Sequence, residues 1–299
     1  MRNKLTKITL SATLGLALAL TFSCSSDDNE GNASSASITG GSNLSSSSVG
    51  VGGSSSSVTG GGVSCPTGIN GTFVDLRDNK SYKWVKICEQ TWMAENLNYE
   101  GFVNGVNGNY WCYDEKPANC DKYGILYDWA TAMGIDTIYN YKEWGESDVN
   151  HRGICPSGWH LPNIADWRVL MKSVNPSCER YQNFSSCNDV VGGALKATSG
   201  WADYRGQSGN GTDVYGFAAL PGGRYILERS VDYPGLDKTF EDVNRLGQWW
   251  LSGEQLPYSS KYIPHLAPNW AMTYRGDVSS IGPGENKYSF FSVRCLKDD

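Results

Sequence analysis

Metal-binding patterns are almost absent from this 299-residue chain. Its three histidines are scattered at His151, His160 and His265, and its nine cysteines include no Cys-x-x-Cys or Cys-x-x-x-Cys pair. Structural zinc sites use such closely spaced ligands. We therefore expect no metal and no cofactor.

Basic clusters are also lacking beyond the N-terminal residues, and the formal net charge is −6. Phosphate binding needs a concentrated basic face, so nucleic acid is excluded as a partner. The catalytic patterns His-Glu-x-x-His and Gly-x-Ser-x-Gly are missing as well, which leaves no motif that favours a hydrolase.

The N-terminal residues predict a lipoprotein signal peptide over residues 1–23. Positive charges precede the apolar run Ile8–Leu20, which is shorter than the roughly 20 residues of a membrane-spanning helix. The small residue Ser23 stands directly before Cys24, as lipoprotein processing requires. We expect Cys24 to carry a lipid that forms the chain's membrane contact. The alternative is an ordinary signal peptide cut elsewhere, with Cys24 incidental.

Composition changes twice after Cys24. Acidic residues at positions 27, 28 and 30 resemble the export signal of surface lipoproteins, so we expect the outer membrane and exposure on the cell surface. Residues 24–64 are rich in Ser and Gly and predict a flexible tether spanning on the order of 35 Å. From Cys65 the chain is rich in aromatic residues, and we assign residues 65–299 to one domain.

Hydrophobic patterns in this domain predict an α+β fold with short antiparallel strands, two to three helices and long loops. The expected helices cover 123–133, 163–174 and 189–198. The expected strands cover 71–76, 81–87, 91–95, 214–220, 249–252, 270–274 and 288–296. Asn163 is suited to cap the second helix. We interpret Trp92, Trp129, Trp159 and Trp167 as core residues, and His160 as a hydrogen-bonded structural histidine.

Six motifs occur in a fixed order along the domain. They are Lys86-Ile-Cys-Glu-Gln-Thr-Trp-Met-Ala-Glu-Asn-Leu-Asn-Tyr99, Tyr123-Gly-Ile-Leu-Tyr-Asp-Trp-Ala-Thr-Ala-Met133, Cys155-Pro-Ser-Gly-Trp-His-Leu-Pro162, Asp213-Val-Tyr-Gly-Phe-Ala-Ala-Leu-Pro-Gly-Gly223, Gly247-Gln-Trp-Trp-Leu-Ser-Gly-Glu254 and Phe291-Ser-Val-Arg-Cys295. Together they resemble the Fibrobacter succinogenes major paralogous domain family over about residues 70–299. The resemblance implies a disulfide-stapled domain related to C-type-lectin-like and sulfatase-modifying-enzyme folds.

If Cys24 carries lipid, the other eight cysteines favour four disulfides in an oxidising compartment. The lectin-like resemblance implies the long-range pair Cys155–Cys295. The family usually has glycine at the position of Cys88, for which Cys65 is the candidate partner. Two further pairs would close local loops, Cys112–Cys120 and Cys178–Cys187. Eight cysteines allow 105 pairings, so the sequence leaves the connectivity open.

Three functions are compatible with this resemblance. The first is a non-catalytic binding or adhesion module for polysaccharide or a surface protein, with aromatic rings that stack on sugars. The candidate ligand residues are Trp201, Tyr204, Tyr233, Trp249 and Tyr258. The second is an enzyme like the formylglycine-generating proteins, which need free thiols. The third is a purely structural envelope protein. Calcium-dependent sugar binding is not expected, because Ala267-Pro268-Asn269-Trp270 lacks the needed carboxylate.

Overall fold

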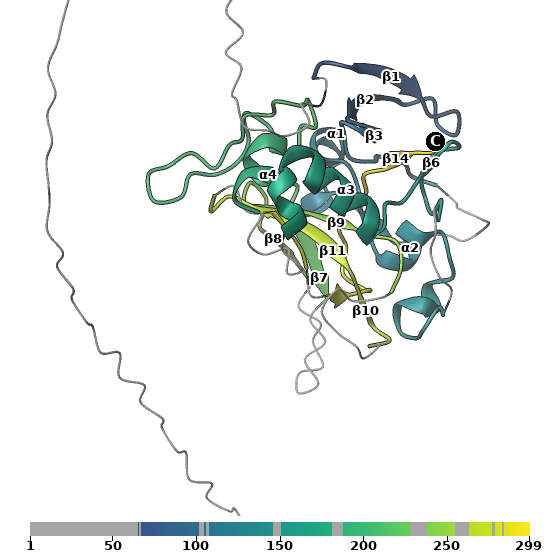
Figure 1. Cartoon of the computed structure of the whole chain (residues 1–299). Helices are drawn as coiled ribbons and strands as arrows, with labels where there is room; N and C mark the ends of the chain where they lie inside the picture. Colours follow the sequence, from purple (N-terminus) through teal and green to yellow (C-terminus); the bar gives the residue numbers. More distant parts are fainter. Residues whose placement is uncertain are drawn as a thin grey trace, which may run out of the picture. The chain divides into compact units, whose positions relative to one another are not determined.

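In the computed structural model (Figure 1) the described residues are 65, 67–101, 105, 108–145, 151–180, 188–227, 238–254, 263–276, 279–282 and 284–299. The predicted signal peptide, Cys24 and the Ser/Gly-rich tether lie outside them. Within these ranges no helix is long and apolar enough to cross a membrane.

A five-stranded antiparallel sheet carries the two ends of the domain. Its order is β1-β2-β3-β14-β6, with bounds Asn70–Val74, Ser81–Ile87, Gln90–Met93, Leu296–Lys297 and Trp159–His160. The first three strands form the meander predicted from the alternating pattern, and those predictions are confirmed. The last strand enters between β3 and β6, so the C-terminal segment closes the sheet.

A second antiparallel sheet has the order β12-β11-β9, with bounds Ser279–Ile281, Asn269–Thr273 and Leu246–Trp250. Three two-stranded ladders complete the strands: β4 (Tyr110–Trp111) with β5 (Leu126–Tyr127), β7 (Arg224–Leu227) with β8 (Lys238–Glu241), and β10 (Leu266–Ala267) with β13 (Glu285–Asn286). Short antiparallel strands therefore prevail, as expected.

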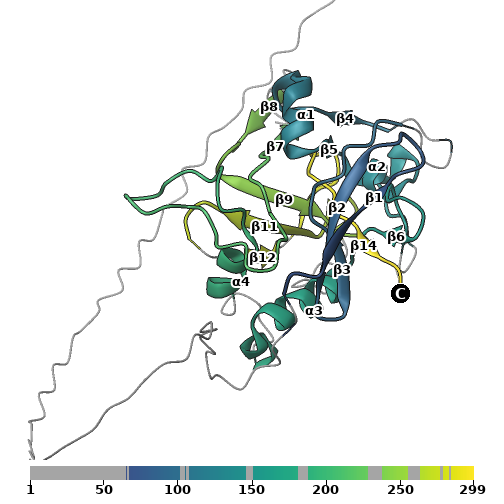
Figure 2. The same ribbon diagram turned by 90° about the horizontal axis from the view of Figure 1, so that it is seen from above.

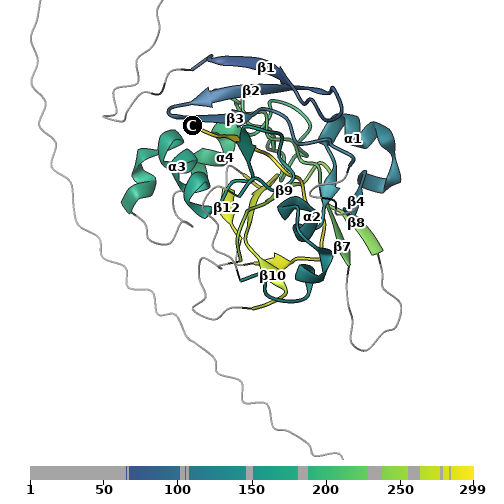
Figure 3. The same ribbon diagram turned by 90° about the vertical axis from the view of Figure 1, so that its right-hand side faces the viewer.

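Four α-helices lie in the described ranges: α1 (Pro117–Tyr123), α2 (Trp129–Met133), α3 (Ile164–Val174) and α4 (Asn188–Leu195). Three 3-10 helices join them: η1 (Tyr113–Glu115), η2 (Thr137–Asn140) and η3 (Pro176–Arg180). Figures 2 and 3 place α1 and α3 on opposite flanks of the β1–β3 meander. The architecture is mixed α+β.

The prediction for α3 is confirmed in detail. The Asn163 side chain accepts hydrogen bonds from the backbone N–H groups of Ala165 and Asp166, at 2.7 and 3.1 Å. The Asp166 carboxylate in turn accepts the Asn163 N–H at 2.8 Å, which completes a capping box. The apolar face of the helix buries Trp167, Leu170 and Met171.

Three predicted elements are wrong. Residues 288–296 form no continuous strand: Phe290, Phe291 and Ser292 make isolated bridges, and only Leu296 belongs to a strand, β14. Residues 123–133 do not form one helix: α1 ends at Tyr123, Gly124 follows at φ +77°, and a new helix starts only at Trp129. Asp128 causes that start because its side chain accepts the Thr131 N–H at 2.8 Å. Residues 214–220 form no strand and contribute only the isolated bridge of Ala219 to Lys196.

Tryptophan dominates the core between the two sheets. Trp92, Trp167, Trp249 and Trp270 are fully buried there, and Trp129 and Trp159 lie in a second apolar cluster. Trp167 stacks on Trp270 with ring centroids 4.6 Å apart. The predicted core tryptophans are therefore confirmed. Each such aromatic pair adds about 0.5–1.5 kcal/mol beyond burial.

Three disulfides lie wholly within the described residues of this loop-rich domain: Cys65–Cys88, Cys112–Cys120 and Cys155–Cys295. These are three of the four pairs considered from the sequence and the resemblance. Cys178 is also disulfide-bonded. Its expected partner Cys187 lies outside the described residues, so that pair stays a prediction.

Candidate functional site

Two adjoining cavities form a polar groove beside helix α1. Their volumes are about 640 and about 390 Å³, and they share Lys80, Asn98, Cys120 and Asp121. We call this the α1 groove. The larger cavity is also lined by Ser81, Tyr82, Lys83, Ala94, Glu95, Asn96, Lys122, Tyr123, Gly124, Asp213, Gly216, Ala218 and Leu220. The smaller one adds Glu100, Tyr110, Trp111, Cys112, Glu115 and Pro117.

One wall of the groove is α1 itself. The helix begins at Pro117, which is favourable in the first turn because its missing N–H would have no partner there. The Cys112–Cys120 disulfide ties it to the preceding segment. At its end Gly124 is required: a Cβ there would lie 2.6 Å from the Cβ of Asn96. This close approach sets the wall directly against the strands.

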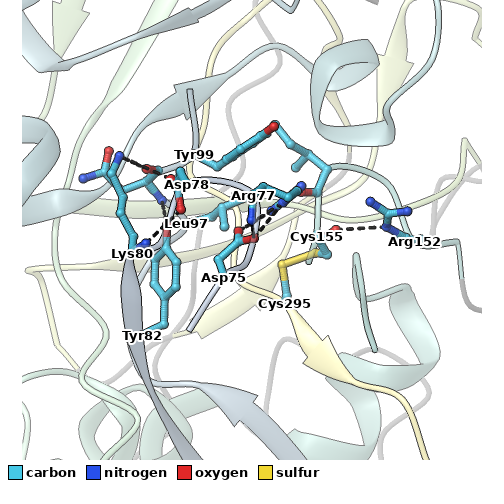
Figure 4. A network of polar contacts seen from close by, with 12 residues as sticks. Asp75, Arg77, Asp78, Lys80, Tyr82, Leu97, Tyr99, Arg152, Cys155 and Cys295 are labelled. Carbon is cyan, nitrogen blue, oxygen red and sulfur yellow. Dashed lines mark hydrogen bonds and ion pairs between the residues drawn. A yellow bond between two sulfur atoms is a disulfide. The ribbon is translucent and has the colours of Figure 1, made fainter. Parts of the chain in front are cut away.

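The opposite wall is formed by Lys80 at the end of the β1–β2 turn, by the first residues of β2 and by the segment after β3. Arg77 holds that turn through Nε–Oδ1 and Nη2–Oδ2 contacts of 2.9 and 2.6 Å to Asp75 (Figure 4). It also donates to the Ile154 carbonyl at 2.7 Å and stacks over Tyr99 at 3.8 Å. Burial alone would raise the pKa of Asp75, but the hydrogen bonds and charge of Arg77 outweigh it and lower the pKa. The turn is therefore rigid.

Asn98 is the central polar residue of the groove. Its backbone N–H donates to the Tyr82 hydroxyl at 3.0 Å, and its carbonyl accepts from the Lys80 ammonium. Its side-chain Oδ1 is buried and has no hydrogen-bond donor among the described residues. Buried polar atoms are nearly always satisfied, so this acceptor is an exception. The half-buried Asn98 residue as a whole lines both cavities.

Two aromatic residues line the smaller cavity together with Asn98. Tyr110 and Trp111 on β4 are both half-buried. Pairing of β4 with β5 fixes their backbone, and Trp111 is held from behind by Tyr225, with ring centroids 5.9 Å apart. Half-exposed flat rings beside carboxylates and an amide suit the stacking and hydrogen bonding of sugar rings.

A buried cation lies beneath the groove. Arg294, which is 1% exposed, donates to Asn96 Oδ1 at 2.8 Å and to the carbonyls of Phe217 and Ala218. Burial lowers the pKa of Arg294 to about 9, so the group stays charged at neutral pH. The negative charge of Asp213 opposes this lowering of the Arg294 pKa, because it favours the charged guanidinium.

This contact explains why three of the sequence motifs occur together. Asn96 comes from the first, Phe217 from the fourth and Arg294 from the last. Trp249 of the fifth motif also donates to Asn96 Oδ1, at 2.8 Å. The motifs therefore meet at one buried polar centre, which supports the groove from below.

Of the predicted ligand residues, the three that the structure describes do not line the α1 groove. Trp249 is fully buried, and Trp201 is 4% exposed with its Nε1 donating to the Ala219 carbonyl at 3.0 Å. Neither ring offers a face to a sugar, so we correct their assignment to core residues. Tyr204 is half-buried at the surface. Tyr233 and Tyr258 lie outside the described residues.

His160 proves to be hydrogen-bonded, as expected, with Nδ1 2.7 Å from Asp298 Oδ1. Within the residues that the structure describes, no group of three or more His, Cys, Asp or Glu side chains is arranged to hold a metal ion. The sequence pointed to the first motif but gave no sign that Asn98 and Trp111 share a groove.

The fold and groove define a mixed α+β, disulfide-linked domain with a polar surface site. The chain belongs to the Fibrobacter succinogenes major domain family, whose model matches residues 85–297. No curated protein and no solved structure matches the chain.

Proposed function

We propose that this chain is a lipoprotein of the outer membrane, anchored through Cys24, whose domain binds polysaccharide in the α1 groove without transforming it. The observation that carries the proposal is that Lys80, Asn98 and the half-exposed Trp111 line one cavity. Sugars supply hydroxyl groups that hydrogen-bond with ammonium and amide groups, and apolar ring faces for the indole.

The charge of the groove favours a neutral sugar polymer. The two cavities are lined by three lysines, Lys80, Lys83 and Lys122, and by five carboxylates, Glu95, Glu100, Glu115, Asp121 and Asp213. Carboxylates prevail, so an acidic polymer would be repelled from the groove. Hydroxyl groups can accept from the ammonium groups and donate to the carboxylates.

The state of the cysteines supports a non-catalytic role. Cys155 and Cys295, the pair nearest to what a formylglycine-generating-like enzyme would use, are joined in a disulfide. A disulfide sulfur is not the thiolate nucleophile or metal ligand that thiol chemistry needs. Thiol titration of the folded, unreduced chain tests this point: a free thiol pair would revive the enzyme alternative.

The proposal includes a C-type-lectin-like scaffold. Two features support it: the long-range Cys155–Cys295 bond, and the last strand β14, which closes the sheet begun by the N-terminal strands. In such a scaffold rigid strands position loops that carry the binding surface.

A pull-down of the full chain in detergent with insoluble xylan and cellulose tests the binding function. We expect retention that falls at least about fivefold in Asn98→Ala and in Trp111→Ala, because each change removes one kind of sugar contact. Asn70→Ala is the matched control, since Asn70 is an exposed amide on β1. Failure of the wild type to bind would leave the purely structural role, and equal binding by the groove variants would place the binding surface outside the α1 groove.

A further inference from the structure

A second surface shares no residue with the α1 groove and has the opposite chemistry. We call it the tyrosine–arginine cluster, and its members are Tyr204, Arg205, Arg245, Tyr274 and Arg275. The two rings meet edge to face, with centroids 5.5 Å apart and planes at 84°. The three arginines are exposed and the tyrosines half-buried.

Each guanidinium is close to a tyrosine ring. Arg205 lies 5.1 Å from the centroid of Tyr204, and Arg245 lies 5.7 Å from that of Tyr274. Arg275 lies between the rings, 5.8 and 5.6 Å from them. Cation–π attraction at such distances orients a guanidinium, and Arg275 also has a side-chain hydrogen bond to Tyr274. The three guanidinium groups are exposed and therefore within reach of a ligand.

The backbone that presents Arg205 is unusual. Tyr204 and Gln207 exchange N–H···O bonds of 2.8 and 3.0 Å across a two-residue turn. Both central residues, Arg205 and Gly206, have positive φ angles of 50° and 79°, as in a type I′ turn. Glycine and asparagine favour such positions. A charged residue there is strained, and such strain is concentrated at binding sites.

Hydrogen bonds tie the turns of the cluster to one another. The Tyr274 N–H donates to the Arg245 carbonyl at 2.8 Å. The buried ammonium of Lys196 donates to the Gly209 and Gly276 carbonyls, each at 2.7 Å. This links the loop after α4 to the turn after β11, which lie side by side in Figure 2. A surface fixed in this way loses little entropy on binding.

The local charge is positive although the chain is acidic overall. Among the described residues, the nearby carboxylates are Asp203, adjacent in sequence, and Asp242, which also lies 3.8 Å from Arg224. The three arginines therefore outnumber the described carboxylates at this surface.

We infer that the tyrosine–arginine cluster binds carboxylate groups of an acidic polysaccharide. Guanidinium groups form two parallel hydrogen bonds with a carboxylate. Three of them on separate turns can engage successive carboxylates of a repeating polymer, and the tyrosine edges offer apolar contact to its sugar rings.

Polygalacturonate and its fully methyl-esterified form are the probes, because they share one sugar backbone and esterification removes the negative charge of the carboxyl groups. We expect the full chain in detergent to bind polygalacturonate in low salt and to lose binding as salt rises. The ester should bind at least about tenfold more weakly, since the charge-assisted hydrogen bonds are lost.

The double variant R205N/R275Q should weaken polygalacturonate binding at least about tenfold. Asparagine tolerates the left-handed backbone at position 205. The matched control K142Q/K297Q removes two exposed charges elsewhere and should change binding less than about twofold. The single variant R245Q gives an independent reading should the double variant unfold, and Asn98→Ala should leave this binding intact.

Three results would overturn the inference: no binding of polygalacturonate, equal binding of the ester, or equal losses in the cluster and control variants. Failure of xylan binding with retained polygalacturonate binding would instead count against the α1 groove alone.

Discussion

The side-chain oxygen of Asn96 accepts a hydrogen bond from the buried guanidinium of Arg294 at 2.8 Å, across 198 positions of sequence. The same oxygen accepts from Trp249 Nε1. The Asn96 amide nitrogen donates to the Tyr123 carbonyl at 2.8 Å. One side chain therefore joins β3, α1, β9 and the C-terminal segment.

Asn96→Ala should lower the free energy of unfolding by about 3 kcal/mol. The change leaves the Arg294 charge with fewer acceptors in the interior, and this costs more than an ordinary hydrogen bond. Urea unfolding measures the loss. In a double-mutant cycle with Arg294→Met the two losses should be less than additive. Full additivity would show that the pair does not interact energetically.

The disulfides Cys155–Cys295 and Cys112–Cys120 should differ in their contribution to stability. Cys155–Cys295 closes a loop with a sequence separation of 140, and Cys112–Cys120 one of 8. In the loop-entropy description, removal by paired Cys→Ala changes should cost roughly 5 and roughly 2.6 kcal/mol respectively. Chemical denaturation of both variants under identical conditions gives the comparison. A larger loss from the short loop would contradict a dominant entropic effect.

The sequence predicted elements with strong local signals and failed where local signals were weak. Alternation revealed β1 to β3, and the Asn163 cap with its apolar stripe revealed α3. Helix α1 was missed because Pro-Ala-Asn-Cys-Asp-Lys-Tyr lacks an apolar stripe. The start of α1 depends on the preceding 3-10 helix, and its position depends on a disulfide. Neither feature can be recognised from the local sequence pattern.

The ligand residues were harder to predict than the elements. Trp249 and Trp250 are adjacent in β9 yet both fully buried, because this strand is covered on both faces. Such a strand shows no alternation of apolar and polar residues, so the sequence pattern does not reveal that both tryptophans are buried. The α1 groove combines residues from β2, β4 and α1, and only tertiary packing brings them together.

Cys24→Ser should release the protein from the membrane. The proposed lipid is attached through the Cys24 sulfur, and a serine at this position offers no thiol for the attachment. Incorporation of radiolabelled palmitate should be lost, and the chain should move from the membrane to the soluble fraction. Ser26→Ala, two positions beyond Cys24, serves as the control. Persistent labelling of Cys24→Ser would show that the anchor lies elsewhere.

Stability should depend on pH through His160. Burial lowers the pKa of His160, but hydrogen bonds and charge from Asp166 and Asp298 outweigh it, so the net pKa is raised. The charged imidazolium links β6 to the C-terminal residues, with Nδ1 2.7 Å from Asp298 and Nε2 3.5 Å from Asp166.

A raised folded-state pKa means that protonation favours the folded state. The stabilisation is fully present below the unfolded value of 6.5 and is lost as the pH rises through the higher folded value. Asp298 is 49% exposed, so solvent screening limits its part to below about 1 kcal/mol. Urea unfolding of the wild type, from about one pH unit below to about two units above the unfolded-state pKa, should show declining stability. Asp298→Asn should flatten this decline at its upper end and leave the stability at high pH nearly unchanged. An unaltered slope in Asp298→Asn would mean that Asp166 alone sets the protonation of His160.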